Sequence, residues 1–231
     1  MIRRNIKKSE NEEENVFWVT MSDMLLGLVM VFMTLFVLTI TGFSQNKIQQ
    51  QATQSEVAKQ LKTELKKQNI QVNVDNLTGQ VKIADLELFD VNSYNLSPRG
   101  KQFLDKFIPI YVNTIFSNQK LSDKIVNVVI EGHTDSQTFS GIPTKEGQFI
   151  KNMDLSLKRA NSVAEYVFST NYNKQYRDKL LKTVVAEGKS FTDPVLVNGK
   201  EDYAKSRRVE LKLVVKDSDF KNFLMKKDSK N

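Results

Sequence analysis

The chain has 231 residues, a formal net charge of +7, one histidine and no cysteine. The absence of cysteine excludes disulfides, thiolate nucleophiles, cysteine-ligated zinc and acylated lipoprotein anchors, and the single histidine excludes a multi-histidine metal site. The lysines are interleaved with Asp and Glu and form no dense basic stripe beside aromatic residues. The positive charge therefore indicates a solvated surface, or attraction to an anionic envelope polymer or membrane, and no direct contact with nucleic acid.

Residues 16–43 are predicted to form a transmembrane helix. A bilayer core of about 30 Å needs about 20 apolar residues, and this stretch contains no proline and a single ionisable residue, Asp23. The apolar run exceeds the usual ~7–15 residues of a signal peptide, and no small-x-small cleavage site follows it. We therefore expect an uncleaved anchor.

Basic residues set the expected orientation of this anchor. Arg3, Arg4, Lys7 and Lys8 precede the helix, whereas Lys47 stands alone after it. By the positive-inside rule, residues 1–15 are a cytoplasmic tail and the rest of the chain lies outside. We therefore predict a single-pass bacterial inner-membrane protein with a periplasmic C-terminal domain.

Asp23 lies roughly 10 Å below the first interface, where an ionised carboxylate costs at least ~2.5 kcal/mol. At 3.6 residues per turn it shares one stripe with small, hydroxylated and apolar residues. The stripe comprises Asp23, Gly27, Met30, Thr34, Val37 and Thr41. Because Gly and Thr favour close helix packing, we predict that Asp23 faces protein and is a protonatable group on an ion path. The alternative is an interfacial Asp that reaches water or caps the helix.

Residues 44–69 are polar and are predicted to form a linker. Ile48, Ala52, Val57, Leu61 and Leu65 give it a thin apolar seam. This pattern is typical of a marginal helix that continues from the membrane and pairs with a copy of itself, and a flexible spacer is the alternative.

The first elements after the linker are a predicted hairpin and a helix. Residues 70–76 and 81–88 alternate apolar and polar side chains around a Gly turn, which indicates two strands. Ser97 and Pro98 read as an N-cap followed by proline at the first helical position, with Pro109 as a potential kink. The predicted apolar face of this helix comprises Phe103, Leu104, Phe107, Ile110 and Tyr111.

The later segments alternate between strands and helices. Residues 125–131 form a buried strand, 136–151 a loop, and Asp154 or Ser156 opens a helix with Leu157, Ala160, Val163, Ala164 and Val167 inward. The remaining predictions are a helical piece at 174–182, a strand at 183–187, a loop at 188–202, an alternating strand at 208–215 and a charged tail at 217–231. We therefore predict one transmembrane helix followed by an α/β (α+β sandwich) domain over residues 70–216.

Three short motifs occur within this domain. They are Gly132-His-Thr-Asp135, the run Asn152-Met-Asp-Leu-Ser-Leu-Lys-Arg-Ala160, and Ser206-Arg-Arg-Val-Glu210. In this order they resemble the signatures of the OmpA-like peptidoglycan-binding domain. The third motif has Ser206 where that family has Asn, and the loop before Asn152 is longer than usual.

This resemblance implies which residues bind the wall. Asp135 would accept hydrogen bonds from the ammonium of a diaminopimelate stem peptide, and Arg159 would hold its carboxylate through two parallel N–H donors. The supporting candidates by motif position are Thr134, Asn152, Arg207 and Arg208. For the two neighbouring arginines the alternative is a salt bridge or a solvated strand end. No catalytic pair is recognisable, so we expect a non-enzymatic protein without cofactor or metal.

The whole layout resembles that of MotB-type stator subunits. Ser22 and Asp23, followed by a Leu- and Gly-rich helix, are most similar to the ZorB group of Zorya anti-phage systems. The resemblance implies a homodimer inside a ring of multi-helix MotA- or ZorA-type subunits, driven by ions, with protons expected. The alternatives are a flagellar stator subunit and a passive peptidoglycan tether that conducts no ions.

Overall fold

The computed structural model describes the backbone of residues 2–216, and the side chains of residues 16–41, 47–48, 50–119 and 121–216. The chain divides into two compact units, whose described parts are residues 2–48 and 49–216. The predicted charged tail at 217–231 lies outside the described residues.

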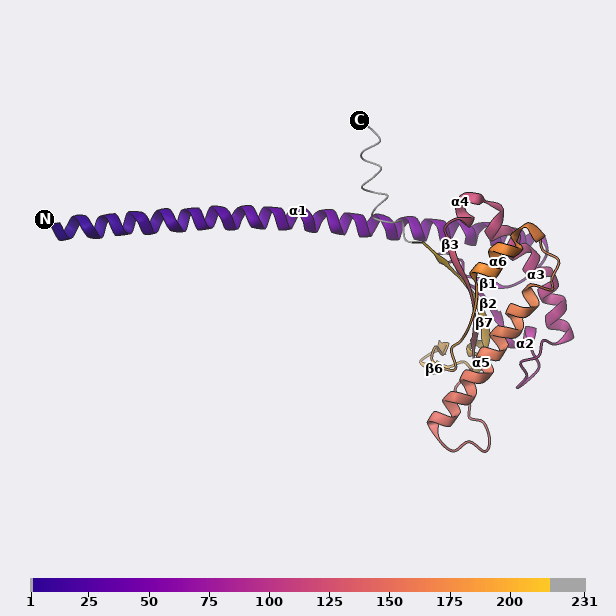
Figure 1. Ribbon diagram of the computed structural model, residues 1–231. Coiled ribbons are helices and arrows are strands. Elements are labelled where there is room, and N and C mark those ends of the chain that lie inside the picture. The colour runs from indigo at the N-terminus through magenta and orange to yellow at the C-terminus, as the bar shows by residue number, and fades with distance from the viewer. Residues whose placement is uncertain (1, 217–231) are drawn as a thin grey trace. The chain divides into compact units, whose positions relative to one another are not determined.

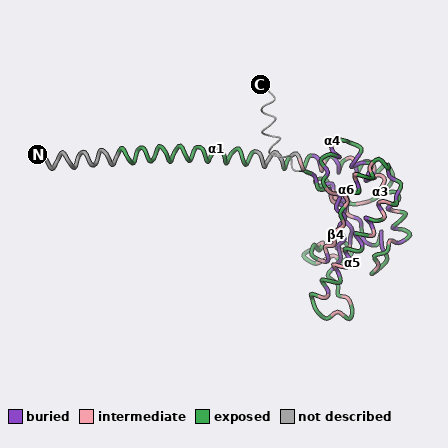
Figure 2. Tube along the Cα trace, viewed as in Figure 1, coloured by how far each residue is buried: buried purple, intermediate pink, exposed green. Residues whose placement is uncertain are grey.

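The described part of the first unit is the N-terminal part of helix α1, which runs from Ile2 to Lys67 and includes residues 2–15 of the predicted tail. Its stretch Val16–Thr41 contains an 18-residue window with a mean hydropathy of 2.5 and is, by length and composition, able to cross a membrane. All side chains of this stretch are exposed, as the green segment of Figure 2 shows. An exposed and mostly apolar surface of this kind is typical of a helix in a hydrocarbon or protein environment, and the stretch lies within the predicted span at 16–43.

From residue 49 onward, α1 belongs to the second unit. Residues 44–67 of the predicted linker are helical throughout, so the alternative of a flexible spacer is wrong for this stretch. Val57, Leu61 and Leu65 are at most 2% exposed and belong to the core of their own domain. These three residues of the predicted apolar seam therefore pack against the chain's own domain and are not available to a second copy. Ile48, at the start of the seam, is exposed.

A five-stranded sheet with the order β1-β2-β7-β3-β4 organises the second unit (Figure 1). Strand β3 pairs in parallel with β4, and the other pairs are antiparallel. The strands are β1 (Asn73–Val74), β2 (Val81–Ala84), β3 (Ile125–His133), β4 (Val184–Gly188) and β7 (Arg208–Val215). The sheet is mixed and carries helices, which confirms the predicted fold class.

One face of the sheet supports the hydrophobic core. Val209, Leu211, Leu213 and Val215 alternate along β7 and are at most 4% exposed, which confirms the predicted inward face. They form one cluster with buried residues of α1, α3 (Pro98–Ser117), α5 (Lys145–Val167) and α6 (Arg177–Thr183). Burial of this apolar area is the main stabilising contribution to the domain.

Helix α3 begins where the sequence predicted. The Ser97 hydroxyl accepts a hydrogen bond from the Gly100 amide at 3.0 Å, and Pro98 occupies the first turn. Leu104, Phe107 and Tyr111 are buried, as expected, and Pro109 lies inside the helix. A short helix that the sequence did not predict, α4 (Gln119–Ser122), follows.

Several predicted boundaries were wrong. The strand at 70–76 shrinks to the two residues of β1, and the strand at 81–88 ends at Ala84, because β7 offers no partner beyond Arg208. The chain instead turns into the short helix α2 (Asp85–Leu88). The predicted loop at 188–202 contains the hairpin β5 (Leu196–Val197) and β6 (Lys200–Glu201), and α7 (Tyr203–Ser206) follows it.

Helix α5 starts at Lys145, not at Asp154 or Ser156. Its cap is Thr144, whose hydroxyl accepts a hydrogen bond from the Gly147 amide at 3.1 Å. Ala160, Val163, Ala164 and Val167 face inward as predicted, but Leu157 is 46% exposed. The 3-10 turn η1 (Lys174–Tyr176), α6 and β4 follow the predicted helix and strand closely.

Candidate functional site

A cavity of about 490 Å³ brings together five of the six predicted wall-binding residues. It lies where the end of β3, helix α2, helix α5 and the segment before β7 meet. Thr134, Asp135, Asn152, Arg159 and Arg207 all line it. Three motifs that are far apart in sequence thus meet at one place.

Asp135 follows directly after β3 and is 6% exposed. One carboxylate oxygen accepts a hydrogen bond from the Gln137 amide at 3.1 Å, and the other is paired with the Arg207 guanidinium. The preceding Thr134 is fixed by its amide, which donates to the carbonyl of Ser190 at 2.9 Å. The acidic group is therefore rigidly held and already has a cationic partner within the chain.

Arg159 projects from α5 and is only 2% exposed. Its Nε donates to the Ser93 carbonyl at 2.8 Å, and its Nη2 lies 3.1 Å from Oδ2 of Asp85. The guanidinium carbon stands 5.3 Å from the centre of the Phe89 ring. These contacts present a fork-shaped cation in a fixed orientation, which suits recognition of a carboxylate.

Asp85 also lines the cavity, although no motif in the sequence marks it. It is 3% exposed, and its Oδ1 has no hydrogen-bond partner among the described residues. Burial raises the pKa of the Asp85 carboxyl to about 6, although Arg159 and Arg207 oppose this shift. The available signal was an acidic residue directly after an alternating strand, ahead of the apolar Leu88 and Phe89.

Asn152 and Gln148 organise the wall of the cavity. The Asn152 amide donates to the Gln148 carbonyl at 3.0 Å. The Gln148 side chain donates to the carbonyls of Phe139 and Ile142 and accepts from the Phe139 amide, at 2.6–2.9 Å. The buried Gln148 therefore connects the long loop after Asp135 to the first turns of α5. The sequence did not indicate this structural role.

Arg208 is the predicted site residue that does not line the cavity. It is 5% exposed, its Nε lies 2.5 Å from Glu210, and its Nη2 lies 2.8 Å from Asp193. In the β7 register it alternates with the inward-facing Val209, so it lies on the opposite face of the sheet. The salt-bridge alternative therefore describes Arg208, while Arg207 reaches the cavity.

On that opposite face, Glu131, His133 and Glu210 place their ligand atoms within 4.8 Å of one another. The His133 Nε2 lies 3.4 Å from Glu131 and 3.7 Å from Glu210. Four cations already compensate these two carboxylates, namely Lys82, Lys189, Arg208 and Lys212. Burial raises the pKa of Glu131, but the bonds from His133 and Lys212 outweigh it and bring it to about 2. We therefore interpret the cluster as a charge network, because little attraction is left for a metal ion.

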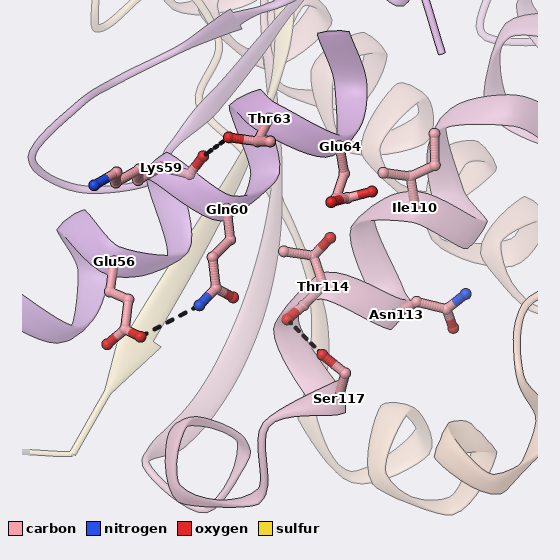
Figure 3. Close-up of a pocket in the computed structure, with 9 residues that line it drawn as sticks. All are labelled: Glu56, Lys59, Gln60, Thr63, Glu64, Ile110, Asn113, Thr114 and Ser117. Atoms are coloured by element: carbon pink, nitrogen blue, oxygen red, sulfur yellow. Dashed lines mark hydrogen bonds between the residues drawn. The ribbon is translucent and has the colours of Figure 1, made fainter. Parts of the chain in front are cut away.

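A larger cavity of about 690 Å³ lies between α1 and α3 (Figure 3). Its polar side chains mostly bond within their own helix, such as Gln60 to Glu56 at 3.2 Å and the Thr63 hydroxyl to the Lys59 carbonyl at 2.9 Å. No predicted site residue lines it. Size alone therefore does not identify the functional site.

In the first unit, the hydroxyl groups of the Asp23 stripe bond to their own helix. Thr34 donates to the Met30 carbonyl at 2.6 Å, and Thr41 to the Val37 carbonyl at 2.7 Å. A Cβ added at Gly27 would meet no atom within 4 Å. Among the described side chains of this stripe, Asp23 carries the single ionisable group.

Comparison with known proteins gives consistent matches. The OmpA family model matches residues 88–208. Two curated relatives from strains of Escherichia coli are named Zorya protein ZorB. One is 31% identical over 216 residues, covering 89% of this chain and 90% of the relative, and the other is 25% identical, covering 90% and 83%. The crystal structure of a putative MotB-like protein from Desulfovibrio vulgaris superposes with a TM-score of 0.51 at 18% identity, covering 73% of this chain and 94% of that chain.

Proposed function

Because the chain belongs to the OmpA family and, within it, to the ZorB family of Zorya proteins, we propose that it is the wall-anchored subunit of an ion-driven motor in the inner membrane. The observation that carries the proposal is the cavity that combines Asp135 with Arg159 and Arg207. One anion beside two fork-shaped cations is the complement of a zwitterionic ligand.

The proposed ligand is the diaminopimelate of a peptidoglycan stem peptide. Asp135 accepts hydrogen bonds from its ammonium, and Arg159 donates two parallel bonds to its carboxylate. Thr134 and Asn152 line the same cavity and contribute polar contacts. Asp135 is paired with Arg207, and Arg159 is paired with Asp85. The charged groups of the ligand therefore replace these internal partners when the ligand binds.

The membrane part of the proposal rests on Asp23. Two copies of the chain place their α1 helices side by side within a ring of a multi-helix MotA- or ZorA-type partner. Each Asp23 takes a proton from the periplasm and releases it to the cytoplasm. One charge crossing the membrane supplies about 2.3 kcal/mol per 100 mV, which is enough to bias a conformational step repeatedly. The wall-bound domain then holds this subunit still while the ring turns, in the service of anti-phage defence.

The wall-binding step is tested by sedimentation of the purified full chain with isolated sacculi. We expect Arg159→Ala to abolish co-sedimentation, because the carboxylate ligand loses its forked donor. The matched control is Lys158→Ala, since Lys158 is the neighbouring residue and its half-exposed side chain pairs with Asp154. Equal binding of wild type and Arg159→Ala would overturn the ligand assignment.

Co-purification from solubilised membranes distinguishes a motor subunit from a passive tether. A stator subunit co-purifies with a multi-helix membrane protein encoded beside it, whereas a tether needs no such partner. Capture of the chain from solubilised membranes without any multi-helix partner would favour the tether.

A further inference from the structure

The Arg159 guanidinium is already paired with a carboxylate of the chain itself. Asp85 lies 3.1 Å from its Nη2, and both residues are at most 3% exposed. A carboxylate of the chain itself therefore holds the same group that a ligand carboxylate needs. An ion pair of this kind lowers the affinity for an external carboxylate, because it must be loosened before the ligand can bind.

Asp85 is itself incompletely bonded. Its Oδ1 and the hydroxyl of Thr134, which lines the same cavity, have no hydrogen-bond partner among the described residues. An unsatisfied buried acceptor of this kind destabilises the ionised form of the carboxyl group.

We propose that Asp85 is a positioning residue that competes with the wall peptide for Arg159, so that proton uptake by Asp85 releases the guanidinium and strengthens wall attachment. The proton goes from solvent to the carboxylate, and no other bond is made or broken. This inference rests on the proposed function, since it assumes that Arg159 binds a ligand carboxylate.

The charged groups that face Asp85 come from three other segments. They are Arg159 on α5, Arg207 before β7 and Asp135 after β3. On its own helix, Glu87 pairs instead with the exposed Arg99 at 2.6 Å. Because Arg207 is occupied by Asp135, the strongest compensation of Asp85 is Arg159.

The Asp85 carboxyl group changes its charge between pH 5 and pH 7.5. Burial raises the pKa of its carboxyl to about 6, so it is ionised at pH 7.5 and mostly neutral at pH 5. The carboxylates of a stem peptide, with reference pKa values of about 3–4, stay ionised over the same range. A change in affinity between these two pH values therefore does not come from the ligand carboxylates, and the comparison with Asp85→Asn assigns it to Asp85.

The test is calorimetric titration of the detergent-solubilised full chain with a diaminopimelate-containing stem tripeptide, at pH 5.0 and 7.5 and constant ionic strength. We expect wild type to bind at least about fivefold more tightly at pH 5.0, since each pH unit above the pKa shifts protonation about tenfold. Asp85→Asn, which imitates the neutral acid, should bind tightly at both values. The control Glu87→Gln removes a carboxylate of the same helix and should keep the wild-type profile.

The outcomes separate this inference from the proposed function. Wild-type binding that is flat or weaker at pH 5.0, or an Asp85→Asn variant that keeps the wild-type profile, overturns the role of Asp85. The wild-type profile needs no variant, so it is informative even if Asp85→Asn folds poorly. Absence of Arg159-dependent binding at both pH values overturns the proposed function instead.

Discussion

Gly132 is in direct backbone contact with Ser156 of α5. A Cβ built on Gly132 would stand 2.0 Å from the Ser156 carbonyl oxygen, far inside any normal contact. This approach presses the end of β3 against the middle of α5. Because Thr134 and Asp135 follow Gly132, while Asn152 and Arg159 flank Ser156, the contact brings the two halves of the cavity together.

Gly132→Ala is therefore expected to destabilise the domain and to disturb the site. Overpacking costs about 1–3 kcal/mol, and a clash with backbone cannot be relieved by a rotamer change. Urea unfolding of the full chain, followed by circular dichroism, measures the loss. Gly27→Ala is the control, because a Cβ there meets no atom within 4 Å. Unchanged unfolding of Gly132→Ala would contradict the close packing of β3 on α5.

Arg208→Met is expected to affect stability and not ligand contact. It removes one partner of the buried Glu210, and breaking a buried pair costs about 3–5 kcal/mol. The same urea titration checks this, with the exposed Lys205→Met as control. The folded fraction should still sediment with sacculi. A stable Arg208→Met protein that fails to bind would show instead that Arg208 contacts the wall.

The sequence predicted which residues meet more reliably than where elements end. The resemblance of three motifs to the OmpA-like signatures implied Thr134, Asp135, Asn152, Arg159 and Arg207 as site residues, and all five line one cavity. The pairing of Asp85 with Arg159 was not predictable, since it joins segments far apart in the chain and no local pattern marks it.

Local signals also competed with one another. Residues 136–151 were predicted as a loop, yet Gly147 lies in the first turn of α5, where the Thr144 hydroxyl accepts a hydrogen bond from its amide. Val57 and Leu61 gave a thin seam that suited pairing with a copy, but the chain's own core buries them. Such choices depend on tertiary contacts, which periodicity alone does not contain.

The stability of the domain should depend on pH through Asp85. Its pKa is about 6 in the folded chain against an ordinary 3.8, so the folded state binds the proton more tightly. Stability from this group is therefore highest below pH 4 and falls as pH rises to about 6, by at most about 3 kcal/mol. Asp85→Asn should lose this component, and Glu87→Gln should keep it, when urea midpoints are compared from pH 4 to 7. Identical pH profiles for Asp85→Asn and wild type would contradict the raised pKa.

Asp23→Asn is expected to abolish motor function while the protein still inserts into the membrane. The amide is nearly isosteric with the acid but cannot gain and lose a proton, so any ion path that uses this group stops. Because an amide costs less than an ionised carboxylate in hydrocarbon, insertion and co-purification with the partner should persist. Phage plaquing on cells that carry the complete system measures function, and membrane fractionation measures insertion. Thr20→Val is the control, since Thr20 lies one turn earlier and bonds to the carbonyls of Val16 and Phe17 of its own helix. Full protection by Asp23→Asn would remove the ion path and leave a wall tether.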